Sequence, residues 1–145
     1  MKPIVVPVND AAEAETLARL VIDRSRAEPL QVHLLNVQRP LPLHIAQFFA
    51  RDELAKVHRE AGMGVLAGAL RLLADARVAC EPHVLVGKPA ETIVRFAADH
   101  GDAEILLDNA STGLLSRLGV GSIASQVRHL LGAHAGSAAP QASGR

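Results

Sequence analysis

A glycine-rich segment near residue 120 has the residue types that bind anionic groups. Gly119, Gly121 and Ser122 stand directly before a stretch whose apolar residues have helical spacing. Free amides at a helix start, together with the helix dipole, form an anion site where glycine lets the backbone approach closely. The same residues also fit a tight turn with a serine N-cap. An anion-binding loop and a purely structural turn are therefore both open interpretations.

The elements that must position this segment alternate between strands and helices. Short β-branched runs predict buried parallel strands, and apolar residues at helical spacing predict helices between them. The predicted strands are 3–8, 30–37, 78–86 and 103–107, and the predicted helices are 11–27, 45–75, 88–100 and 122–131. This order favours an α/β fold with one open, doubly wound parallel sheet of four strands.

Two local features qualify these elements. Pro82 places the third strand at an edge or a bulge, because proline cannot donate to the ladder. Gly62 and Gly64 predict a kink in the long second helix, since each glycine weakens a helix by about 1 kcal/mol relative to alanine.

Residues 132–145 contain no Val, Ile, Leu or Phe. We expect this tail to be disordered, which leaves one domain over residues 1–131.

Composition excludes several classes of function. Fifteen Lys and Arg balance fifteen Asp and Glu, and aromatic residues make up only 2% of the chain. A balanced charge and the lack of stacking platforms argue against nucleic acid as a partner. No stretch is apolar enough to span a membrane, and the start lacks the apolar core of a secretory signal. With the single Cys80, these features predict a cytoplasmic protein.

The sequence predicts no catalytic residue and no metal site. No nucleophile stands in a recognisable motif beside a base. Cys80 and His83 are three apart on a predicted strand, so they point to opposite faces of the sheet and do not form a metal pair. The other histidines are predicted to be solvated or to cap helices; they are His33, His44, His58, His100, His129 and His134.

Three segments resemble the corresponding parts of universal stress proteins. They are Val5-Val6-Pro7-Val8-Asn9, Val86-Gly87-Lys88-Pro89-Ala90-Glu91-Thr92-Ile93 and Leu115-Ser116-Arg117-Leu118-Gly119-Val120-Gly121-Ser122-Ile123-Ala124. The likeness runs from Pro3 to about Leu131. It implies a nucleotide-binding α-hydrolase-like fold with five strands, the last of which pairs across a dimer. This sequence has no strand-like segment after residue 131, so the usual fifth strand is predicted to be missing.

The resemblance also implies a pocket at the carboxyl ends of the strands. Nucleotide-binding members have a G-x-x-G loop, nine residues, and then G-S or G-T. In this chain Asp108 and Ser111 stand at the first two glycine positions. Where such members end the first strand with an acidic residue, this chain has Asn9. The candidate pocket residues are Pro7, Val8, Asn9, Val37, Gly87, Asp108, Ser111, Gly121, Ser122 and Ile123.

Two functions follow from the resemblance and from these departures. The first is a stress-response module that acts through self-association or an unknown protein partner, with nucleotide binding weak or absent. The second is an ATP-binding or slowly ATP-hydrolysing member that uses the altered loop 108–122. The carboxylate of Asp108 near an anion favours the first. No cofactor is predicted, and ATP or AMP is the ligand if there is one. Without a fifth strand, residues 104–107 form an open edge, which predicts a homodimer.

Overall fold

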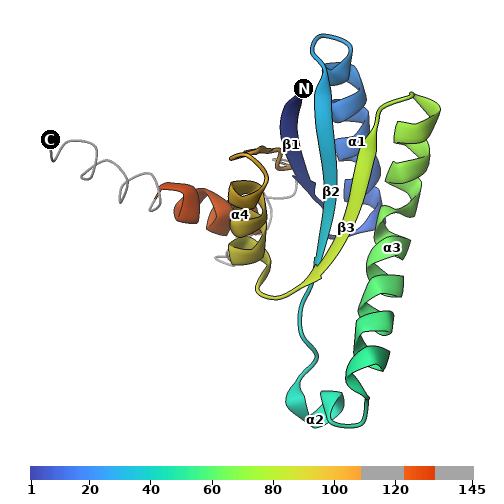
Figure 1. Cartoon of the computed structure of the whole chain (residues 1–145), viewed down its shortest axis with the longest axis vertical. Coiled ribbons are helices and arrows are strands. Elements are labelled where there is room, and N and C mark those ends of the chain that lie inside the picture. Colours follow the sequence, from blue (N-terminus) through green and yellow to red (C-terminus); the bar gives the residue numbers. More distant parts are fainter. Residues whose placement is uncertain (109–122, 133–145) are drawn as a thin grey trace, which may run out of the picture.

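A computed structural model of the chain describes residues 1–108 and 123–132. Within them, four parallel strands form one open sheet in the order β3-β2-β1-β4 (Figure 1). The strands are β1 (Lys2–Pro7), β2 (Leu30–Gln38), β3 (Cys80–Val86) and β4 (Glu104–Ile105). The helices are α1 (Ala11–Ser25), α2 (Leu43–Ala46), α3 (Arg51–Asp75) and α4 (Pro89–Asp99), followed by a helix at 123–132. The predicted α/β class and parallel sheet are confirmed.

The structure corrects the predicted fourth strand, the predicted helix 45–75 and the kink predicted within that helix. The fourth strand is shorter than residues 103–107, because only Glu104 and Ile105 have register partners in β1, although the N–H of Leu106 still donates to the carbonyl of Val5. The predicted helix 45–75 is divided into α2 and α3. α3 then runs without a break through Gly62 and Gly64. The edge position that Pro82 predicted for the third strand is confirmed, since β3 lies at one end of the sheet.

Two apolar cores lie on the two faces of the sheet. α1 and α3 cover one face, and α4 with the helix at 123–132 covers the other (Figure 1). The alternation of β1 shows the division: Ile4 and Val6 face the first core, and Val5 faces the second. Both faces of the central strands are therefore buried, which explains their continuous apolar sequence.

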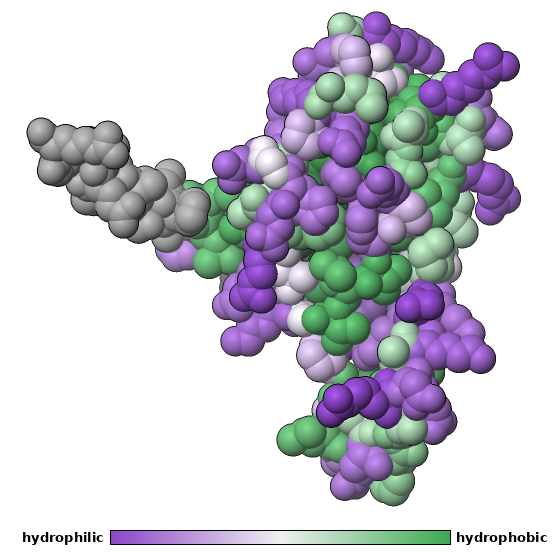
Figure 2. Space-filling model, in the orientation of Figure 1, coloured by the Kyte–Doolittle hydropathy of each residue, from purple (hydrophilic) through white to green (hydrophobic). Residues whose placement is uncertain are grey.

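α2 and the beginning of α3 do not pack on the sheet. α2 and the first turns of α3 project beyond the sheet, and we call residues 43–57 the arm (Figure 1). No residue of the arm is buried, and the side chains of Leu43 and Phe48 are more than three-quarters exposed. Figure 2 shows apolar surface at the end of this projection. No helix in the described part of the chain is long and apolar enough to cross a membrane.

Gly62 sets the distance between α3 and the sheet. A Cβ atom at this position would lie 2.4 Å and 2.6 Å from the two methyl carbons of Val84 and 3.1 Å from Oδ1 of Asn36. A Cβ at Gly64, two residues later, would have nothing within 4 Å. The glycine at 62 is therefore required by packing, whereas the one at 64 is not.

An ion pair joins the edge strand β4 to the end of α1. The two terminal guanidinium nitrogens of Arg24, Nη1 and Nη2, donate to the carboxylate of Glu104, with Nη2 at 2.8 Å from Oε1. Lys2 Nζ lies 3.0 Å from the same Oε1. Arg24, and then Lys2, lowers the pKa of Glu104 from its usual 4.5 to about 2. The pair fixes a short strand that has only two residues in the ladder.

We expect Gly62→Ala to destabilise the protein and Gly64→Ala to stabilise it. Both changes gain up to about 1 kcal/mol of helix propensity. At 62 the new methyl group overlaps the stiff, β-branched Val84, and overpacking of this kind costs about 1–3 kcal/mol. Urea unfolding of the two variants measures the difference. Equal stability of the two would contradict the close approach of α3 at Gly62.

We expect Glu104→Gln to cost about 1 kcal/mol at pH 7, as for a partly exposed ion pair, and nothing at pH 2. The folded pKa of Glu104 is lowered, so its contribution is complete above about pH 4.5 and is lost as the pH falls toward 2. Denaturant unfolding of variant and wild type across this range measures the difference. Glu60→Gln is the control, because Glu60 is exposed and lies 4.0 Å from Lys56. A cost that stays constant with pH would contradict the ion-pair origin.

Candidate functional site

A line of hydrogen bonds crosses the carboxyl ends of β1, β2 and β3. The buried side chain of Asn36 donates through Nδ2 to the carbonyl of Val8 at 2.9 Å. Its Oδ1 accepts from Nε2 of Gln38 at 2.6 Å. The carbonyl of Gln38 in turn accepts from the N–H of Gly87 at 2.9 Å. Three of the predicted pocket segments therefore meet at one edge of the sheet, which we call the carboxyl edge.

The start of α1 brings carboxylates to the same edge. Asp10 is the N-cap, and its Oδ1 accepts from the N–H of Glu13 at 2.8 Å. Oε1 of Glu13 accepts from the N–H of Asn9 at 3.2 Å. Burial raises the pKa of Glu13, and the charges of Asp10 and Asp108 add to this although the Asn9 amide opposes it. Asp10, Glu13 and Asp108 thus form an acidic group, which we call the acidic cluster.

The structure places seven of the ten predicted pocket residues. Pro7, Val8, Asn9, Val37, Gly87 and Asp108 follow or end the strands at the carboxyl edge, and Ile123 begins the last helix. Val37 and Ile123 pack against the core under α4. Ser111, Gly121 and Ser122 lie outside the described residues, so their part in a pocket stays a prediction.

Sequence reasoning missed Asn36 and Glu13 at this edge. A polar residue at position 36, within the apolar run of β2, was the available signal for a buried hydrogen-bonding side chain. The proximity of Glu13 to Asp108 had no such signal, because it depends on β4 lying beside β1.

A groove opens beside the carboxyl edge on the α4 side. It has a volume of about 620 Å³ and lies between the start of α4 and the helix at 123–132. Its lining includes the cations of Arg39 and Lys88 together with the carboxylate of Glu91. Gly87 precedes Lys88 directly, but none of the seven predicted pocket residues that the structure describes lines the groove.

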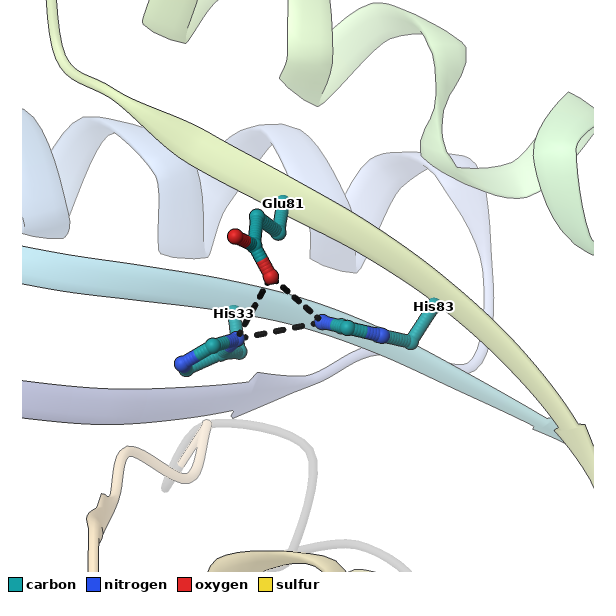
Figure 3. Close-up of side chains that lie close together, drawn as sticks. All are labelled: His33, Glu81 and His83. Atoms are coloured by element: carbon teal, nitrogen blue, oxygen red, sulfur yellow. Dashed lines mark hydrogen bonds and ion pairs between the residues drawn. The ribbon is translucent and has the colours of Figure 1, made fainter. Parts of the chain in front are cut away.

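A second polar group lies on the sheet face under α4. Nδ1 of His33 on β2 is 3.1 Å from Nε2 of His83 on β3, and Oε2 of Glu81 is 3.7 Å from each of these nitrogens (Figure 3). Phe96 of α4 and His100, the residue that caps the end of α4, lie against the two imidazoles. Burial lowers the pKa of both His33 and His83, and charge on the neighbouring imidazoles lowers them further, while Glu81 opposes the shift.

The histidine predictions are corrected in part by these positions. His33 and His58 are buried, so a solvated or capping role is wrong for both. His100 does cap a helix end, since its Nδ1 lies 2.7 Å from the carbonyl of Phe96. The prediction that Cys80 and His83 face opposite sides of the sheet is confirmed, because Cys80 packs against the α1–α3 core and His83 against Phe96. Burial raises the pKa of Cys80 to about 11.

Solved structures similar to this chain share its fold. A universal stress family protein from Burkholderia pseudomallei has a TM-score of 0.65 at 18% identity, with 89% of each chain covered. The universal stress protein of Archaeoglobus fulgidus in complex with dAMP has a TM-score of 0.59 at 22% identity, covering 88% of this chain and 89% of that one. A universal stress protein in complex with cAMP has a TM-score of 0.62 at 19% identity, covering 88% and 90%.

Sequence comparison gives the family. No curated protein matches the sequence. The sequence profile of the universal stress protein family, however, matches residues 1–131, which include both cores and the whole carboxyl edge. The chain belongs to the universal stress protein family.

Proposed function

We propose that this universal stress protein is a stress-response module that binds adenine nucleotides weakly or not at all. The observation that carries the proposal is the acidic cluster of Asp10, Glu13 and Asp108 at the carboxyl edge. Two unit charges 4 Å apart interact by about 1 kcal/mol even in water. A nucleotide phosphate placed here would meet several carboxylates, each of which opposes its binding.

The amides at the start of α1 add to this argument. A helix start attracts anions because its first N–H groups have no partner within the helix. In this chain the amide of Glu13 already donates to Asp10, and the amide of Asn9 already donates to Glu13. The protein's own carboxylates therefore occupy donors that a phosphate would otherwise use.

The alternative is a protein that binds ATP or slowly hydrolyses it. Solved relatives in complex with dAMP and cAMP support it at the level of the fold. The cations of Arg39 and Lys88 beside the carboxyl edge also favour an anionic ligand. The two functions differ in affinity for nucleotide, so a binding measurement separates them.

Without a strong ligand, self-association or binding of a partner protein in the cytoplasm is the proposed mode of action. β4 is the last strand of the sheet among the described residues. The N–H of Leu106 donates to the carbonyl of Val5 at 2.9 Å. Because the backbone groups of a strand alternate in direction, the N–H and carbonyl of Ile105 point away from β1. These groups are suited to pair with β4 of a second copy.

We expect calorimetry to give a dissociation constant for ATP or AMP no tighter than about 1 mM. Removing charge from the acidic cluster should then improve binding. The triple variant Asp10→Asn, Glu13→Gln, Asp108→Asn keeps the acceptor oxygens of the helix start, and we expect it to bind ATP at least about fivefold more tightly. A micromolar constant for the wild type would contradict the proposal and support the alternative.

The control for this series is Asp99→Asn. It also removes a negative charge, but at an exposed residue at the C-terminal end of α4, whereas the N-terminal end of α4 follows Gly87 at the carboxyl edge. A similar gain from this variant would show a general charge effect instead of a local one. The pair Asp108→Gly and Ser111→Gly tests the loop separately, since it also restores the backbone freedom of glycine. If only this pair improves binding, the limiting factor is the backbone and the charge argument fails.

We expect the wild-type protein to be a homodimer in light scattering at micromolar concentrations. Ile105→Pro removes the outward N–H and should shift the protein to the monomer, while the bond from Leu106 to Val5 remains. Circular dichroism must show that this variant keeps its fold. A monomeric wild type, or a folded and still dimeric variant, would contradict pairing through β4.

A further inference from the structure

We propose that His33, Glu81 and His83 form a binding site for a divalent transition-metal ion, with Zn²⁺ as the ion that the geometry fits (Figure 3). The site lies on the sheet face under α4, within the strands and not at the carboxyl edge. It is independent of nucleotide binding and uses none of the pocket residues.

The register of two strands brings the three side chains together. His33 of β2 is paired with Glu81 of β3, and His83 follows two residues later on the same strand. Residues two apart on a strand point to one face, and paired residues of neighbouring parallel strands do the same. All three side chains therefore project toward α4, and the backbone of the sheet fixes their spacing.

The distances between the donor atoms are those of neighbouring ligands on one ion. Zn²⁺ binds imidazole nitrogen and carboxylate oxygen at about 2.0–2.2 Å in tetrahedral geometry, so two such donors lie about 3.3–3.6 Å apart. The three donor atoms here are separated by 3.1 Å, 3.7 Å and 3.7 Å. An ion placed between them reaches all three ligands with shifts of a few tenths of an ångström.

Two imidazoles and one carboxylate suit a borderline metal. Hard ions such as Mg²⁺ prefer oxygen ligands and octahedral geometry, whereas imidazole selects Zn²⁺ and its neighbours. Each nitrogen must offer a lone pair, so the hydrogen now shared between His33 Nδ1 and His83 Nε2 moves to the outer nitrogen of its own ring. Three protein ligands leave the fourth position of a tetrahedral ion for water.

The surroundings hold the ligands in place and leave one side accessible. The side chain of His33 is only 3% exposed, and that of His83 is 23% exposed. The ring of Phe96 lies 5.7 Å from the first imidazole and 4.7 Å from the second, and it stacks on His100. Glu81 is 67% exposed, so an ion reaches the site from solvent past this carboxylate. A bound ion would join the edge strand β3 to β2.

Zinc titration of the full chain, without nucleotide and by calorimetry, tests the site. We expect one Zn²⁺ per chain with a micromolar or tighter constant, a rise in melting temperature, and no binding of Mg²⁺. Co²⁺ in place of Zn²⁺ should give the visible absorption of a tetrahedral ion without a thiolate charge-transfer band, because Cys80 lies on the opposite face.

His83→Ala and Glu81→Gln are the informative variants. Both side chains are more accessible than that of His33, so replacing them is less liable to unfold the protein. Even outer-shell changes cost about 10–100-fold in metal affinity, so we expect each variant to lose at least about tenfold. His44→Ala removes an exposed histidine of α2 and should bind as the wild type does. Circular dichroism shows whether each variant is folded.

Absence of Zn²⁺ binding by the wild type would overturn the site. Unchanged affinity in a folded His83→Ala or Glu81→Gln variant would also overturn it, because the ion would then be held elsewhere. An equal loss in His44→Ala would have the same consequence. None of these outcomes depends on whether the protein binds ATP, so failure here and failure of the proposed function are distinguishable.

Discussion

The parallel register of β2 between β1 and β3 is the constraint on which both polar sites depend. β2 is paired with β1 over residues 30–35 and with β3 over residues 32–38, and its alternate residues face opposite sides of the sheet. Asn36 projects to the α1–α3 side and joins the ends of three strands through Val8 and Gln38. His33 projects to the α4 side and meets β3. A slip of one residue would exchange the two faces and abolish both arrangements.

The protein's own hydrogen bonds hold the framework of the carboxyl edge together. The hydrogen-bonded line from Val8 to Gly87 is a property of the strand ends and needs no nucleotide. Beside it, the helix start that could receive a phosphate is capped by the chain's own acids. The same N-cap that stabilises α1 therefore works against an anionic ligand, so stability and binding compete for one set of amides.

From the sequence, the strands and helices could be predicted better than the contacts that they make with one another in the sheet. β-branched runs and helical spacing are local properties, and Pro82 restricts its own strand, so the sheet class and the edge position of β3 could be derived. Contacts between strands are not local. His33 and Glu81 are 48 positions apart, and only the register of β2 with β3 makes them neighbours. A comparison of Cys80 with His83 along one strand gave the correct faces but did not lead to the partner across the ladder.

The length of the fourth strand could not be predicted from the local sequence either. The apolar run at 105–107 predicts a longer strand, yet only Glu104 and Ile105 join the ladder. Ile105 and Leu107 pack toward one core and Leu106 toward the other, so the alternation of a strand continues past the paired residues. Apolar alternation thus indicates which side chains are covered, but not how many backbone groups find a partner.

The first turns of α3, residues 51–57, belong to the exposed arm at residues 43–57, whereas the rest of the helix has buried residues that pack in the core. The first buried residue of α3 is His58, directly after the arm, and the contact at Gly62 follows one turn later. Segments with few buried contacts open at low free energy, whereas core segments open only with the whole domain. Amide hydrogens of one continuous helix should therefore exchange with solvent at very different rates, fast before His58 and slow around Leu66 and Leu73. The helix would then belong to two cooperative units, and the sheet would stay intact while the arm unravels and reforms.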